Sequence, residues 1–119
     1  MERKITTDLL KWKMNPDKKP IILYGISGCG KTHTTLEFAK KEYKNMIYFD
    51  CVNNLELDYV FDKNNTLDKL IRALSALSLE TIFKDDTLII FDNVSEKVLN
   101  AIKNYFTNEN YHVIMIANS

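Results

Sequence analysis

Hydrophobic and polar positions follow two patterns along this chain, one typical of helices and one typical of buried strands. Ile5, Leu9 and Trp12 recur at helical spacing and predict a helix over residues 3–13. Four short runs of mostly apolar residues occupy positions 21–24, 46–50, 87–91 and 113–117. Apolar runs of this length, with little polar alternation, are typical of strands that are covered on both faces of a sheet.

Segments with helical periodicity separate these strands. Residues 31–43 place Thr35, Phe38 and Ala39 on one face, and a short helix is expected around residues 55–61. Two later helices should begin after a serine or threonine that can cap them, Thr66 and Ser95. Their apolar stripes are Leu67, Leu70, Ile71, Leu74, Leu77 and Leu79 in the first, and Val98, Leu99, Ile102 and Phe106 in the second.

Strands that alternate with helices predict an α/β fold, in which helices cover both faces of a parallel sheet. Ligands of such sheets bind beyond the carboxyl ends of the strands. Polar segments follow directly after Tyr24, Phe91 and Ala117, at the ends of three predicted strands. We therefore expect these segments to meet at one edge of the sheet.

The first of these segments has the pattern G-x-x-x-x-G-K-[ST], and the chain's three glycines all fall within it. Glycines allow positive φ angles and a close approach of the backbone to phosphate, while successive N–H groups bind anionic oxygens. A helix that begins near Lys31 adds the positive end of its dipole. The predicted phosphate-binding residues are Gly25, Ser27, Gly28, Cys29, Gly30, Lys31 and Thr32.

A phosphate cradle of this kind is paired with a metal-binding acid on a neighbouring strand. Lys31 should reach the β- and γ-phosphates, and the Thr32 hydroxyl should ligate Mg²⁺. Asp92 follows four consecutive apolar residues and is the expected second metal ligand. The predicted ligand is therefore a nucleotide with β- and γ-phosphates, bound together with Mg²⁺.

Two asparagines are the candidates for contact with the attacking water. Asn93 follows Asp92 and can hold a water but cannot accept its proton. Asp50 and Glu96 are possible substitutes for a base, although both fit ordinary surface or capping roles. Asn118, at the end of the last strand, is placed to contact the γ-phosphate or the water.

Composition narrows the setting. The 119 residues fit one domain spanning 1–119, and 16 basic residues balance 16 acidic ones, so charge does not indicate nucleic-acid binding. The apolar runs are too short to cross a bilayer, and two cysteines form no metal-ligand pattern. We expect a cytoplasmic protein, with a protein partner or self-association open. Tyr24 and Tyr48 are expected in the core, and the two histidines, His33 and His112, in structural positions.

The chain resembles prokaryotic AAA-type ATPases of the P-loop superfamily, in particular ATP-binding cores joined to a C-terminal domain of unknown function. The matching segments are residues 9–13 (LLKWK), 19–25 (KPIILYG), 30–32 (GKT), 37–40 (EFAK), 47–49 (IYF) and 88–92 (LIIFD). The resemblance implies a three-layer P-loop fold with the strand before the cradle in a central position. It also implies ATP and Mg²⁺ as cofactors, with ATP or ADP as the bound nucleotide, and it implies that Asn118 or Ser119 occupies the sensor position.

The resemblance also implies differences. Asn93 stands where the family has Glu after the metal-binding Asp, and Ile26 and Ser27 stand where it often has Arg. Such cores usually continue through a fifth strand and a helical lid, so we expect the N-terminal part of an AAA-type core without the lid. ATP binding is therefore better supported than hydrolysis.

Two other functions stay open. A non-catalytic regulatory or interaction module could keep the fold without turnover, which Asn93 favours. A small nucleotide kinase needs several arginines, and this chain has only Arg3 and Arg72. A GTPase is disfavoured because no asparagine is followed by lysine, as a guanine-specifying N-K-x-D segment requires.

Overall fold

The four predicted strands form one parallel sheet in the computed structural model, which describes residues 2–15, 19–25, 30–52, 54–63, 66–106 and 111–118. The strands are β1 (Ile21–Gly25), β2 (Asn45–Asp50), β3 (Thr87–Asp92) and β4 (His112–Asn118). Their order across the sheet is β1-β4-β3-β2, and every neighbouring pair is parallel. Residues of β3 are buried throughout, as expected for an inner strand covered on both faces.

The position of β1 corrects one expectation. The resemblance implies a central place for the strand before the cradle, but β1 lies at the edge of the described sheet, beside β4. Sequence periodicity shows that a strand is buried, not which neighbours it has. The apolar residues of β1 are only half-buried, which fits an edge strand.

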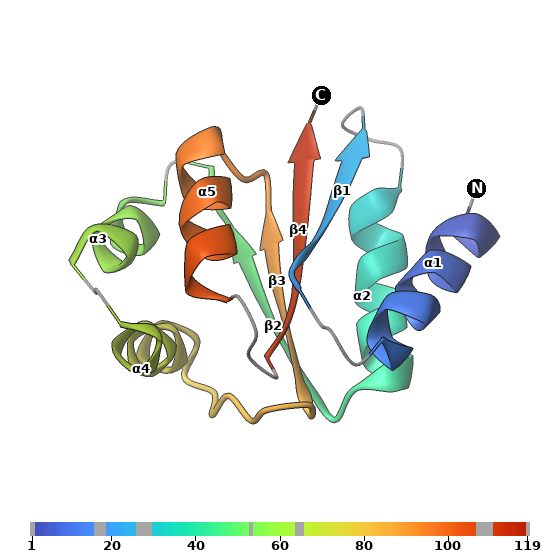
Figure 1. Ribbon diagram of the computed structural model, residues 1–119, viewed down its shortest axis with the longest axis horizontal. Coiled ribbons are helices and arrows are strands. Elements are labelled where there is room, and N and C mark those ends of the chain that lie inside the picture. Colours follow the sequence, from blue (N-terminus) through green and yellow to red (C-terminus); the bar gives the residue numbers. More distant parts are fainter. Residues whose placement is uncertain are drawn as a thin grey trace.

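Helices cover both faces of the sheet, as predicted (Figure 1). On one face lie α1 (Glu2–Met14) and α2 (Lys31–Glu42). On the other lie α3 (Leu55–Lys63), α4 (Leu67–Ser78) and α5 (Glu96–Tyr105). Each face has its own apolar core, because successive side chains of β3 and β4 point to opposite faces. Within the described ranges, no helix is long and apolar enough to cross a membrane.

The predicted caps are confirmed. Thr66 Oγ1 accepts a hydrogen bond from the backbone N–H of Lys69, and Ser95 Oγ accepts one from Val98, each at 3.3 Å. The apolar stripe of α4 is correct through Leu77, but its last member is wrong. Leu79 lies beyond the end of the helix, has φ of 59° and is 91% exposed. A left-handed residue ends a helix by turning the chain away, which removes its side chain from the stripe.

Helix α1 is fixed to the rest of the domain by two side chains near its C-terminus. Trp12 Nε1 donates a hydrogen bond to the Lys19 carbonyl, 2.7 Å away, just before β1. Lys13 Nζ donates to the Glu42 carbonyl at 2.8 Å and lies 3.3 Å from the Glu42 carboxylate, at the end of α2. These contacts join the end of α1 to the segment before β1 and to the end of α2.

His112 is buried at the start of β4. Tyr43 Oη and His112 Nδ1 are hydrogen-bonded, and His112 Nε2 lies 3.0 Å from Asp85 Oδ1. A neutral ring with its proton on Nε2 satisfies both contacts, because it donates to Asp85 and accepts from Tyr43. The structural role predicted for this histidine is confirmed.

Candidate functional site

The polar segments predicted to meet do converge at the carboxyl ends of the strands. Strand register places Gly25 beside Asn118 and Asp50 beside Asp92. Strand β4 lies between β1 and β3, so the glycine-rich segment and Asp92 leave the sheet on either side of the same strand. This edge is the one at which parallel α/β sheets bind ligands.

The last glycine of the G-x-x-x-x-G-K-T segment begins helix α2. Gly30 has φ of 78°, and no side chain caps the helix that follows it. A Cβ at Gly30 would meet no neighbouring atom, so the glycine is needed for its backbone conformation rather than for space. The helix therefore begins with backbone N–H groups that no capping side chain satisfies, which is the arrangement that binds anions.

The centre of the site is a contact between two residues predicted to bind metal. Thr32 Oγ1 donates a hydrogen bond to Asp92 Oδ2 at 2.8 Å. Thr32 lies in the first turn of α2 and Asp92 ends β3, 60 residues later in the chain. Asp92 is only 5% exposed, so its carboxylate depends on hydrogen bonds from the protein.

Tyr48 is a site residue that the sequence analysis missed. It is 38% exposed rather than in the core, and its hydroxyl donates to Asp92 Oδ2 at 2.5 Å. Burial, followed by the hydrogen bond to Asp92, raises the pKa of Tyr48, so the hydroxyl stays protonated and acts as the donor. Tyr24, also expected in the core, is exposed as well.

A signal for Tyr48 was present in the sequence. Side chains alternate across β2, with Ile47 and Phe49 buried on one face and Tyr48 and Asp50 exposed on the other. Tyr48 therefore shares a face with the acidic residue that ends its strand. Its aromatic ring made it look like a core residue.

Asn93 takes part in the same network. It adopts φ of 57°, and its backbone N–H donates to Asp92 Oδ1 at 2.9 Å. Its Nδ2 donates to Asp50 Oδ1 at 3.2 Å, so the ends of β2 and β3 are joined. Asp50 also accepts the Val52 N–H at 3.0 Å and serves as a local structural acid. Glu96 lies in the first turn of α5.

Several predicted residues cannot be placed. Ser27, Gly28, Cys29 and Ser119 lie outside the described residues, as do the side chains of Lys31 and Asn118. For Lys31 the described feature is its position as the first residue of α2, and for Asn118 its place at the end of β4, beside Gly25.

The second cysteine, Cys51, is described and lies directly beside the site. Its backbone N–H donates to the Asp92 carbonyl at 2.9 Å. Burial, followed by the nearby Asp50 carboxylate, raises the pKa of the Cys51 thiol to about 12. The thiol is therefore protonated at physiological pH, the form that is a weak nucleophile.

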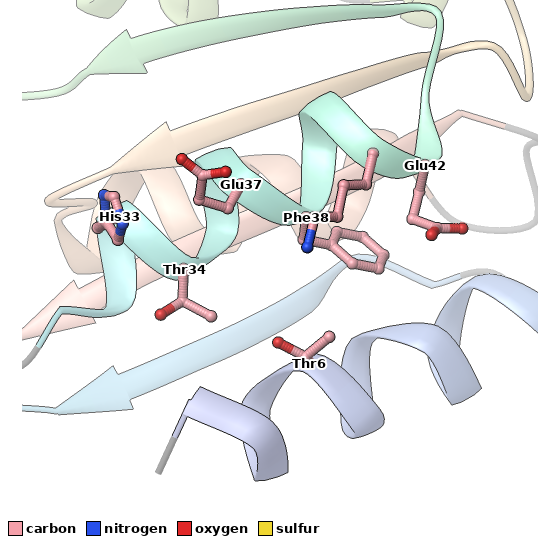
Figure 2. Close-up of a pocket in the computed structure, with 7 residues that line it drawn as sticks. Thr6, His33, Thr34, Glu37, Phe38 and Glu42 are labelled. Carbon is pink, nitrogen blue, oxygen red and sulfur yellow. The ribbon is translucent and has the colours of Figure 1, made fainter.

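A groove of about 200 Å³ runs between α1 and the flank of α2 and begins one residue after Thr32 (Figure 2). Thr34 and Thr6 project toward each other from the two helices. Thr34 is 6% exposed, and its Oγ1 has no hydrogen-bond partner among the described residues. The other lining residues are His33, Glu37, Phe38, Lys41 and Glu42.

The described part of the chain contains no group of three or more His, Cys, Asp or Glu side chains that could hold a metal ion. This finding does not bear on Mg²⁺, which is commonly held by one or two protein oxygens together with phosphate and water.

An all-parallel α/β sheet, with a glycine-initiated helix after its first strand and a buried acid ending its third, is the architecture of a P-loop NTPase-like protein. The chain belongs to the AAA domain family, whose model matches residues 17–119. It is thus a nucleotide-binding, ATPase-like module. A search of curated proteins finds no match for the chain.

Proposed function

We propose that this domain binds ATP together with Mg²⁺, with residues 25–32 around the phosphates and with Thr32 and Asp92 at the metal. The observation that carries the proposal is the 2.8 Å distance between Thr32 Oγ1 and Asp92 Oδ2. Two neighbouring ligands of an octahedral Mg²⁺ ion, each about 2.0–2.1 Å from it, lie about 2.9 Å apart. The two oxygens are therefore spaced as adjacent ligands of one such ion.

The chemistry of the two groups also fits this ion. A hydroxyl and a carboxylate are hard oxygen ligands, which Mg²⁺ prefers to sulfur or imidazole. When bound, Mg²⁺ would neutralise negative charge on the phosphates. Lys31 and the N–H groups at the start of α2 would hold the phosphate oxygens.

The groove between α1 and α2 supports a site for the nucleoside. It begins at His33 and Thr34, within one helical turn of Thr32. The Glu37 carboxylate lines this groove and can accept a hydrogen bond from an exocyclic amine. A groove with a few convergent polar groups is typical of small-molecule sites.

The proposed activity is binding with weak hydrolysis. Asn93 cannot accept a proton from water, and its side-chain amide already donates to Asp50. A non-catalytic regulatory module is the second candidate, and the same Asn93–Asp50 contact favours it because it engages the side chain that stands where the resembled family has Glu.

The binding test uses a fluorescent ATP analogue with Mg²⁺, on the native chain, on Lys31→Ala and on a matched control. Lys40→Ala is the control, because Lys40 is an exposed lysine in the last turn of the same helix. We expect Lys31→Ala to weaken binding at least tenfold and Lys40→Ala to leave it unchanged. Equal affinity in all three proteins would contradict the proposed phosphate site.

The hydrolysis test restores an acid at position 93. Glutamate there would face the Asp50 carboxylate and would adopt a left-handed backbone, which costs about 1 kcal/mol for a residue other than Gly, Asn or Asp. We therefore propose Asn93→Glu in an Asp50→Asn background, with Asp50→Asn alone as control. Faster phosphate release from the double variant than from the control supports a missing base. Equal release in both favours the regulatory module.

A further inference from the structure

Asp92 is held by hydrogen bonds on both of its carboxylate oxygens. Oδ2 accepts from the hydroxyls of Thr32, at 2.8 Å, and Tyr48, at 2.5 Å. Oδ1 accepts from the backbone N–H of Asn93, at 2.9 Å. These three donors come from three elements, the start of α2, strand β2 and the turn after β3. Together they fix both the position and the rotation of the carboxylate.

A bound cation would replace one of these three hydrogen bonds and leave the other two. A cation shared by Thr32 Oγ1 and Asp92 Oδ2 would replace the hydrogen bond between those two atoms. The Tyr48 hydroxyl and the Asn93 N–H would remain as the bonds that hold the carboxylate in place. The Asn93 bond is made by the backbone next to Asp92, so Tyr48 supplies the one side-chain donor of the three that is not itself a metal ligand.

We infer that Tyr48 is a positioning residue for the metal-binding carboxylate, holding Asp92 Oδ2 toward Thr32 so that the two oxygens receive a divalent cation together. The inference rests on the proposed function and adds to it a residue from the neighbouring strand β2. Hydrogen bonds from outer residues to a ligating carboxylate set its orientation, and their loss typically weakens metal binding 10- to 100-fold. Tyr48 is partly exposed, so we expect an effect near the lower limit.

The test replaces only the hydroxyl. Tyr48→Phe removes the donor and keeps the ring, and Tyr111→Phe is the matched control. Tyr111 lies just before β4, at the opposite end of the sheet, where its ring contacts Phe106 and Lys84. Free Mn²⁺ is followed by electron paramagnetic resonance as each protein is titrated in the presence of a non-hydrolysable ATP analogue. Affinity for the analogue is also measured in EDTA, and melting temperature without ligands.

We expect Tyr48→Phe to need about ten times more Mn²⁺ for half-saturation than the native chain. Its affinity for the analogue in EDTA should stay within twofold, and Tyr111→Phe should match the native protein in both assays. The metal readout is the important one, because a tyrosine that only stabilised the fold would lower the melting temperature without changing Mn²⁺ affinity.

Three results would overturn the inference. Mn²⁺ affinity of Tyr48→Phe within twofold of native, or tighter, would show that the hydroxyl does not position the ligand. Equal losses of analogue binding with and without metal would show a general structural role. If the native chain itself shows no metal-dependent nucleotide binding, the proposed function fails and this inference fails with it, whereas the first two results leave that function standing.

Discussion

Replacing Thr34 by valine should stabilise the domain. Thr34 is 6% exposed, and within the part of the chain that the structure describes its hydroxyl has no hydrogen-bond partner, whereas its neighbour Thr35 is fully buried and does have a partner. An unsatisfied buried hydroxyl costs about 1–3 kcal/mol. Valine has nearly the same shape and the same branching at Cβ, so the change removes this cost with little change in packing or helix propensity.

We expect Thr34→Val to raise the free energy of unfolding by about 1 kcal/mol, which corresponds to about 4 °C in melting temperature for a chain of this length. Thr35→Val should lower it by about 1–3 kcal/mol, because the change breaks a buried hydrogen bond. The two variants differ by one position on the same helix, so the opposite signs isolate the effect of the missing partner.

Urea denaturation of the nucleotide-free proteins, followed by circular dichroism, gives both free energies, provided that the m-values agree. If Thr34→Val is no more stable than the native protein, or if both variants lose stability equally, the Thr34 hydroxyl does not destabilise the fold.

Further predictions concern other buried groups. Trp12→Phe removes the hydrogen-bond donor of the Lys19 carbonyl, so the free energy of unfolding in urea titrations should fall by about 1–2 kcal/mol. An unchanged free energy of unfolding would mean that other contacts hold α1. The Cys51 thiol should be alkylated far more slowly in the native chain than in urea at pH 8, since its pKa is about 12; equal rates by mass spectrometry would contradict this. The pKa values of Cys51 and Tyr43 are raised in the folded state, so the stability that these two groups contribute is complete below about pH 9 and is lost as pH rises further. Urea titrations at pH 8 and pH 10 would detect this loss of stability. Cys51→Ala should make the loss smaller.

Much of this fold and part of its site could be predicted from the sequence. Apolar runs located every strand, and the pairing of a glycine-rich segment with Asp92 anticipated the Thr32–Asp92 contact. These features depend on local pattern and on the rule that parallel strands end at one edge. The edge position of β1 was not predicted, because strand order depends on contacts between residues that are distant in sequence. Leu79 was misplaced because nothing in its residue type marks a left-handed helix end.

Tyr48 shows why a site is harder to predict than a fold. A tyrosine within a predicted strand is expected to pack in the core, and the residues on both sides of Tyr48 do pack there. What gives Tyr48 its other role is the register of β2 against β3, which pairs Tyr48 with Ile90 and Asp50 with Asp92. Tyr48 lies on the same face of the sheet as the two acids, two residues before Asp50, and its hydroxyl bonds Asp92, while the side chain of Asn93 bonds Asp50. The geometry of the proposed metal site therefore depends on the pairing of two strands, and changes in β2 should affect that site as directly as changes in the glycine-rich segment.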